Sequence, residues 1–205
     1  MTRLHIGRRR SLAAVMILTL AAACASSNVL SVKYQLPPPA GEILARSVTI
    51  AFVDDRKSDA FLTPSARNEL EGFAGVYALT VSRPGGVAEL KGAYPVDMLL
   101  REVLRYRLES AGVKLVPPGT KADVELKLVL KEFQLDFGDR KWSAAVAYTA
   151  QLLRNATMAS QQTITGSAER TFLMGKSDAD KVVGELVSDT INKLDVALLF
   201  KQAGM

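Results

Sequence analysis

Residues 124–138, VELKLVLKEFQLDFG, decide the fold of this chain. Apolar side chains occupy the even positions of residues 124–130 and the odd positions of residues 133–137. Alternation with a period of two is typical of a β-strand that buries one face. Because no turn residue separates the two halves, the change of phase predicts one long strand with a β-bulge at Lys131-Glu132.

More strands are predicted on both sides of this segment. Downstream, Trp142 to Leu153 and Thr163 to Met174 alternate in the same way, and neighbours in sequence usually pair antiparallel when short connections join them. Upstream, Ser47 to Val53 is rich in β-branched residues and predicts another strand. Val76 to Ser82 and Gly86 to Leu90 flank a Pro-Gly-Gly turn, which indicates a hairpin.

Two segments carry a helical period instead. From Pro95 to Ala111, apolar residues recur at spacings of three and four while charged residues take the other face. A second apolar stripe runs from Ser177 to about Phe200, and Ser177 with Asp180 forms a partial capping box at its start. Each helix has one apolar stripe and needs a sheet face to cover. The sequence therefore predicts an α+β domain: a twisted antiparallel β-sheet with two amphipathic helices packed on one face.

The amino terminus has the features of an export signal. Four arginines within residues 3–10 precede an apolar run over residues 12–23, which is well short of the roughly 20 residues that span a bilayer. The run ends in LAAAC, residues 20–24, which resembles a lipobox, the site where lipoprotein signal peptidase cuts. We therefore predict a signal peptide over residues 1–23 and lipidation of Cys24, the only cysteine. The alternatives are a stray cysteine or an ordinary signal cut in the alanine tract.

Lipidation would hold the rest of the chain at a membrane, because two or more acyl chains bind firmly. The second position after cleavage is Ala25 rather than Asp, which by resemblance to lipoproteins of double-membraned bacteria indicates the periplasmic face of the outer membrane. Residues 24–45 predict a proline-rich tether that could extend to about 60 Å, although Val29 to Tyr34 could instead pair as an edge strand. Residues 46–205 suit a single periplasmic domain.

The net charge of +5 arises mainly from this signal. Four of the 26 Lys and Arg residues lie within residues 1–23 and none of the 21 acidic residues does, so 22 basic and 21 acidic residues remain. No basic run with interleaved aromatic residues is left, which argues against a nucleic-acid partner. The single histidine, His5, leaves with the signal, which removes Ser-His-Asp and Cys-His catalysis and histidine-containing zinc sites.

Two groups of side chains remain as candidates for chemistry. Asp54, Asp55 and Asp59 could bind Ca²⁺ or Mg²⁺, but basic residues lie among them and favour a solvated turn after a strand. Three aromatic residues fall in predicted strands: Trp142, Tyr148 and Phe172. Core packing explains them better than a binding platform for a lipid or protein. We therefore predict no catalytic residue, no metal and no cofactor.

Four stretches share their pattern with a known family: Asp54-Asp55-Arg56, Pro95-Val96-Asp97, Ala122-Asp123-Val124 and Val187-Ser188-Asp189-Thr190-Ile191. Together with the lipobox, they resemble the YajG-like family of envelope lipoproteins. The family supplies no catalytic residues to carry over. The resemblance implies a non-catalytic, membrane-anchored interaction or accessory module of the cell envelope.

An auxiliary lipoprotein of an ABC-type lipid transport system is the alternative. Tyr34-Gln35-Leu36-Pro37 resembles the opening Tyr-x-Leu-x-x-Pro of such proteins, with a different spacing to the proline. An unrecognised enzyme that uses carboxylates or a Ser-Lys pair is a third hypothesis. The expected partners are the membrane, through acyl chains on Cys24, and an envelope protein that binds an exposed sheet edge or the helix-free face.

Overall fold

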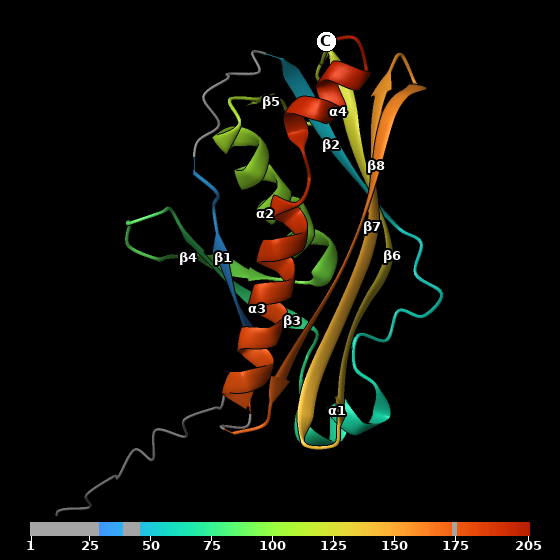
Figure 1. The fold of residues 1–205 in the computed structure, drawn as a ribbon. Coiled ribbons are helices and arrows are strands. Elements are labelled where there is room, and N and C mark those ends of the chain that lie inside the picture. The colour runs from blue at the N-terminus through green and yellow to red at the C-terminus, as the bar shows by residue number, and fades with distance from the viewer. Residues whose placement is uncertain (1–28, 39–45, 174–175) are drawn as a thin grey trace, which may run out of the picture.

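Two mixed β-sheets with helices packed against them form the part of the chain described by this computed structural model, residues 29–38, 46–173 and 176–205 (Figure 1). The five-stranded sheet has the order β5-β2-β6-β7-β8, and the three-stranded sheet has the order β1-β3-β4. The predicted α+β class is confirmed. The strands of the larger sheet are β2 (Ser47–Asp54), β5 (Lys114–Leu115), β6 (Val124–Gly138), β7 (Lys141–Arg154) and β8 (Thr157–Thr171).

The long strand β6 forms an antiparallel meander with β7 and β8, as the sequence predicts. The pairing of β6 with β7 shifts between Leu130 and Glu132, so the predicted β-bulge is confirmed. Two-residue turns join these strands. Both central residues of each turn, Asp139-Arg140 and Asn155-Ala156, have positive φ angles between 51° and 62°. Such turns match the natural twist of the strands they connect.

β2 corrects the expectation of a purely antiparallel sheet, because it runs parallel to both β6 and β5. The chain leaves β2, passes through two helices, two strands of the smaller sheet and β5, and returns to the same end before β6 begins. Polar contacts join the starts of the two strands. The backbone N–H and hydroxyl of Ser47 each donate to Asp123 Oδ2 at 2.8 Å. These hydrogen bonds hold the pKa of Asp123 below its usual value.

The smaller sheet consists of β1 (Val29–Gln35), β3 (Val76–Ser82) and β4 (Glu89–Tyr94). The predicted hairpin is confirmed as β3 and β4, although its second strand begins at Glu89 rather than at the predicted Gly86, and β1 adds to it in parallel. β1 lies inside the segment predicted as a tether, and this part of that prediction is wrong. Leu30, Val32 and Tyr34 are fully buried, because their alternation gives β1 an apolar face. The edge-strand alternative for this segment is the one observed.

The helices are α1 (Pro64–Glu69), α2 (Val96–Ser110), α3 (Lys176–Asn192) and α4 (Val196–Gln202). α2 matches the prediction, whereas α1 was not expected. The final helix is bent: its first part ends at Asn192, and Asp195 caps the second part through a hydrogen bond from Leu198 N to Asp195 Oδ1, 2.9 Å. Gln162 of β8 secures the bend by donating to Asp195 O at 2.7 Å and accepting from Asp195 N at 3.1 Å.

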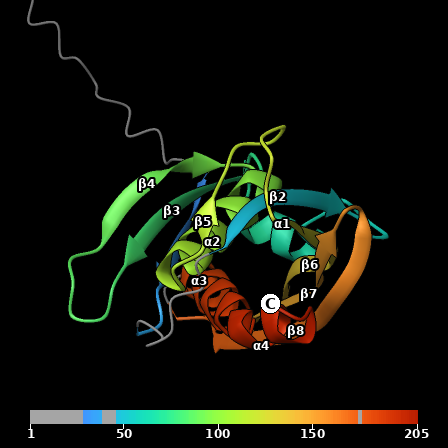
Figure 2. The same cartoon turned by 90° about the horizontal axis from the view of Figure 1, so that it is seen from above.

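Helices α2 and α3 lie between the two sheets (Figure 2). α3 contacts β1 of the smaller sheet on one side and β7 and β8 of the larger sheet on the other. Gly166 of β8 permits this packing, since a Cβ atom there would overlap Cγ2 of Thr190. Tyr148 of β7 adds a hydrogen bond from its hydroxyl to Thr190 O, 2.9 Å. α3 therefore joins the two sheets.

Candidate functional site

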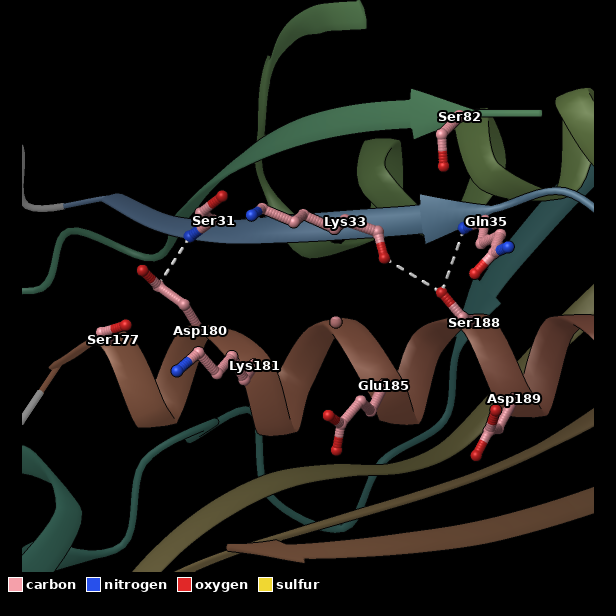
Figure 3. Close-up of a pocket in the computed structure, with 11 residues that line it drawn as sticks. Ser31, Lys33, Gln35, Ser82, Ser177, Asp180, Lys181, Glu185, Ser188 and Asp189 are labelled. Atoms are coloured by element: carbon pink, nitrogen blue, oxygen red, sulfur yellow. Dashed lines mark hydrogen bonds between the residues drawn. The ribbon is translucent and has the colours of Figure 1, made fainter. Parts of the chain in front are cut away.

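A stripe of four α3 residues lies along the outer edge of β1, and Figure 3 shows two of them, Asp180 and Ser188. The stripe repeats every four residues and consists of Asp180, Gly184, Ser188 and Asn192. Ser31 N donates to Asp180 Oδ1 at 2.8 Å. Ser188 Oγ donates to Lys33 O at 3.0 Å and accepts from Gln35 N at 3.3 Å. Asn192 Nδ2 donates to Gln35 O at 2.9 Å. Side chains of the helix thus replace the missing neighbour strand.

Two features hold α3 close to β1 along this contact, which we call the seam. Gly184 lets the helix approach β1 closely, because a Cβ atom there would lie 3.1 Å from Lys33 N. The buried Tyr34 hydroxyl donates to Asn192 Oδ1 at 2.9 Å. Burial raises the pKa of Tyr34 above its usual value, so this group stays a neutral donor.

A polar groove of about 510 Å³ lies over the seam, lined by both β1 and α3. Burial raises the pKa of Asp180 here, although the Ser31 N–H and the charges of Lys176 and Lys33 act in the opposite direction. Across the described residues, no cluster of three or more His, Cys, Asp or Glu side chains has the geometry to hold a metal. The groove offers hydrogen-bonding groups of both charges.

A second hollow, of about 440 Å³, lies just beyond the end of β1. It is mainly apolar and is lined by Leu36, Pro37, Pro38, Arg83, Pro84, Tyr106, Glu109 and Ser110. Leu36 is buried, and its N–H donates to Ser82 O at 2.9 Å. The Tyr34-Gln35-Leu36-Pro37 segment therefore leads from the seam into this hollow.

Of the three predicted acidic residues, Asp54, Asp55 and Asp59, the first two each pair with a basic side chain. Asp54 accepts two hydrogen bonds from the Arg56 side chain, at 2.9 and 2.7 Å, and these lower the pKa of Asp54. Asp55 forms an ion pair with Lys131. The turn that follows β2 is thus a set of ion pairs rather than an assembled cation site.

The predicted aromatic candidates lie in the core or beside it. Trp142 and Tyr148 are almost fully buried. Phe172 is partly buried, with its ring centroid 5.3 Å from that of Phe137. These positions favour core packing over a binding platform. Cys24, the predicted lipidation site, lies outside the described residues, so its lipidation stays a prediction.

β8 presents the longest exposed strand edge of the described part of the chain. Its outer edge is the end of the five-stranded sheet, and no strand pairs with it there. Charged residues and proline usually protect such edges from pairing. Residues 157–168 contain neither. On the face away from α3, exposed Thr163 and Thr165 lie beside Thr149 and Ala147 of β7. This edge and face can form backbone hydrogen bonds with an extended segment.

The α3 stripe was missed in the sequence. Asp180 and Ser177 predict a capping box, but α3 begins at Lys176, before Ser177, and Asp180 binds the β1 backbone instead. The capping-box prediction is wrong because the carboxylate has a partner about 150 residues away in sequence. The four-residue spacing of these α3 residues is visible in the sequence. No local pattern, however, indicates that they contact β1.

Comparison with known proteins identifies a solved structure that shares this fold. No family model and no curated protein matches the sequence. Among solved structures, a Xanthomonas campestris protein of family DUF330 is similar, with a TM-score of 0.58, 14% identity, and coverage of 86% of this chain and 95% of that chain. This similarity shows a shared fold.

Weaker similarities include two bacterial lipoproteins. A minor lipoprotein from Acinetobacter baumannii has a TM-score of 0.40 and 10% identity, over 79% of this chain and 93% of that chain. A putative lipoprotein from Caulobacter crescentus has a TM-score of 0.39 and 15% identity, over 53% of this chain and 84% of that chain.

Asn192→Ala should destabilise the domain. It removes the acceptor of the buried Tyr34 hydroxyl and the donor to Gln35 O. Leaving a buried polar group unpaired costs about 1–3 kcal/mol, so we expect a loss of this size in the unfolding free energy measured by urea denaturation. Asp189→Ala, on the exposed side of the same helix, is the matched control and should change stability by less than about 0.5 kcal/mol.

A double-mutant cycle isolates the Tyr34 contact. In a Tyr34→Phe background the hydroxyl is absent, so Asn192→Ala should cost less than in the wild-type chain. Equal costs in both backgrounds would show that the Tyr34–Asn192 hydrogen bond contributes nothing.

Proposed function

We propose that this chain is a lipid-anchored lipoprotein of the cell envelope, sorted to the periplasmic face of the outer membrane, and that its domain is a non-catalytic interaction module. The lipobox-like segment ending at Cys24 and the resemblance to YajG-like lipoproteins support the anchor. The described residues include no histidine or cysteine, which limits the catalytic chemistry they could perform. No helix among them is long and apolar enough to span a membrane.

The edge of β8 is the observation that carries the interaction role. The edge of β1 is covered by α3 side chains, whereas the outer edge of β8 has no strand beside it in the described part of the sheet. The uncharged stretch of this edge, residues 157–168, can accept an added strand through main-chain hydrogen bonds, with specificity supplied by alternate side chains. We therefore propose an extended segment of another envelope protein as the partner of β8.

The second candidate function is that of an auxiliary lipoprotein in an ABC-type lipid transport system. The observation that favours it is the apolar hollow beyond β1, which begins at the Tyr34-Gln35-Leu36-Pro37 segment. Arg83 at its rim has the charge that a lipid phosphate would require. A partner identified at β8 as a permease or substrate-binding component would favour this function.

Cys24→Ala tests the anchor. Because the thiol would be the acceptor of the acyl chains, the variant should lose radiolabelled palmitate incorporation in cells and move from the membrane to the soluble fraction. Cells that express the unchanged chain are the control. Palmitate labelling that persists in Cys24→Ala would contradict lipidation at this residue.

Two substitutions to lysine on β8 test whether its outer edge binds the partner. A photo-crosslinking amino acid in place of the exposed Gln161 should capture one envelope protein in cells. Thr163→Lys combined with Thr165→Lys places two positive charges on the edge strand, as natural edge strands do to prevent pairing, and should abolish that crosslink. Thermal unfolding should show that the fold survives, because both side chains are exposed.

Thr149→Lys is the matched control for these lysines. Thr149 lies opposite Thr163 on the same face but in the interior strand β7, so it should leave the crosslink intact. If Thr149→Lys also abolished the crosslink, the partner would contact the sheet face that points away from α3 rather than the edge of β8. A crosslink to a second copy of the chain, or one that survives the edge lysines, would contradict the proposed strand addition.

A further inference from the structure

The position of β1 limits how far the domain can lie from its anchor. This inference rests on the proposed lipidation of Cys24. Val29 begins β1 five residues after Cys24, and an extended chain spans at most about 3.5 Å per residue, or about 17 Å in all. β1 cannot serve as extra tether without loss of the core, because Leu30, Val32 and Tyr34 are fully buried.

A chain of hydrogen bonds shows which surface lies beside the start of β1. Ser31 N binds Asp180 near the beginning of α3. In the same part of the helix, Asp178 Oδ2 accepts from Leu173 N at 2.8 Å. Next to Leu173, Phe172 N donates to Arg140 O in the β6–β7 turn at 2.8 Å. The start of α3, the end of β8 and the β6–β7 turn therefore form one end of the domain (Figure 1).

This end, defined by Arg140, Leu173 and the first turn of α3, has side chains suited to a lipid surface. Leu173 is 80% exposed, and its backbone N–H is fixed by Asp178. Arg140 is exposed at the tip of the β6–β7 turn and forms no ion pair within the described residues. An apolar side chain next to a basic one is the combination that binds a membrane interface.

The opposite end of the domain provides an internal reference. Met158 is 52% exposed near the β7–β8 turn. Thr171 lies thirteen positions further along β8, and at about 3.3 Å per residue this places Met158 about 40 Å from the first end. With the first end on the bilayer and β8 along the membrane normal, Met158 therefore lies well clear of the headgroups.

We infer that the end formed by Arg140, Leu173 and the first turn of α3 rests on the phospholipid surface. Leu173 enters the interface and Arg140 lies among the lipid phosphates. Strands β6, β7 and β8 then extend away from the membrane, and the edge of β8 is presented along its length to a partner in the periplasm.

Site-specific fluorescence tests this orientation. Once Cys24 is acylated the chain has no free thiol, so Leu173→Cys and Met158→Cys each supply a single labelling site. Each lipidated full-length protein is labelled and reconstituted into vesicles of phosphatidylethanolamine and phosphatidylglycerol that contain lipids with a nitroxide on the headgroup. The fluorophore at residue 173 should be quenched several-fold more strongly than the one at residue 158.

The outcomes separate the orientation from the anchor. Both labelled side chains are exposed, so both variants should keep the wild-type circular dichroism spectrum. Equal quenching at the two positions, stronger quenching at residue 158, or no quenching at residue 173 of an acylated protein would overturn the orientation alone. A mass spectrum without acyl chains on Cys24 would overturn the anchor and the orientation with it.

Discussion

The hydrogen bonds between the edge of β1 and the α3 stripe of Asp180, Gly184, Ser188 and Asn192 hold this structure together. They join residues that are 149 to 158 positions apart in sequence. The same helix packs on β7 and β8 through its opposite side, with Gly166 providing the space. Without the stripe, the polar groups along one edge of β1 would lose their partners, and the smaller sheet would lose its attachment to α3.

Two of the four edge strands, β1 and β8, differ in a way that matters for function. A strand edge with unpaired backbone groups invites another strand. At β1, side chains of α3 satisfy those groups and close the edge. At β8, fifteen residues form an edge with no neighbouring strand in the described part of the sheet. The covered edge of β1 lies near the proposed anchor, and the open edge of β8 extends away from it. This arrangement suits a membrane-held module that binds an extended partner.

Local patterns in the sequence predicted the parts of the fold that depend on local contacts. The phase change at Lys131-Glu132 located the β-bulge, and spacings of three and four located α2. Parallel pairing was not predicted, because the partners of β1 and β2 are distant in sequence. The bend before α4 depends on Gln162, which lies on another strand. The α3 stripe has a visible period, but only the folded chain shows that it faces β1.

The central claim is that β1 belongs to the folded domain because α3 covers its edge. Native-state hydrogen exchange at the amides of Ser31 and Gln35 tests it most directly, since both donate to α3 side chains rather than to a strand. Both amides should exchange slowly, and Ser188→Ala should accelerate exchange at Gln35. Exchange of Ser31 and Gln35 at the rate of an unfolded chain, in the intact protein, would contradict it.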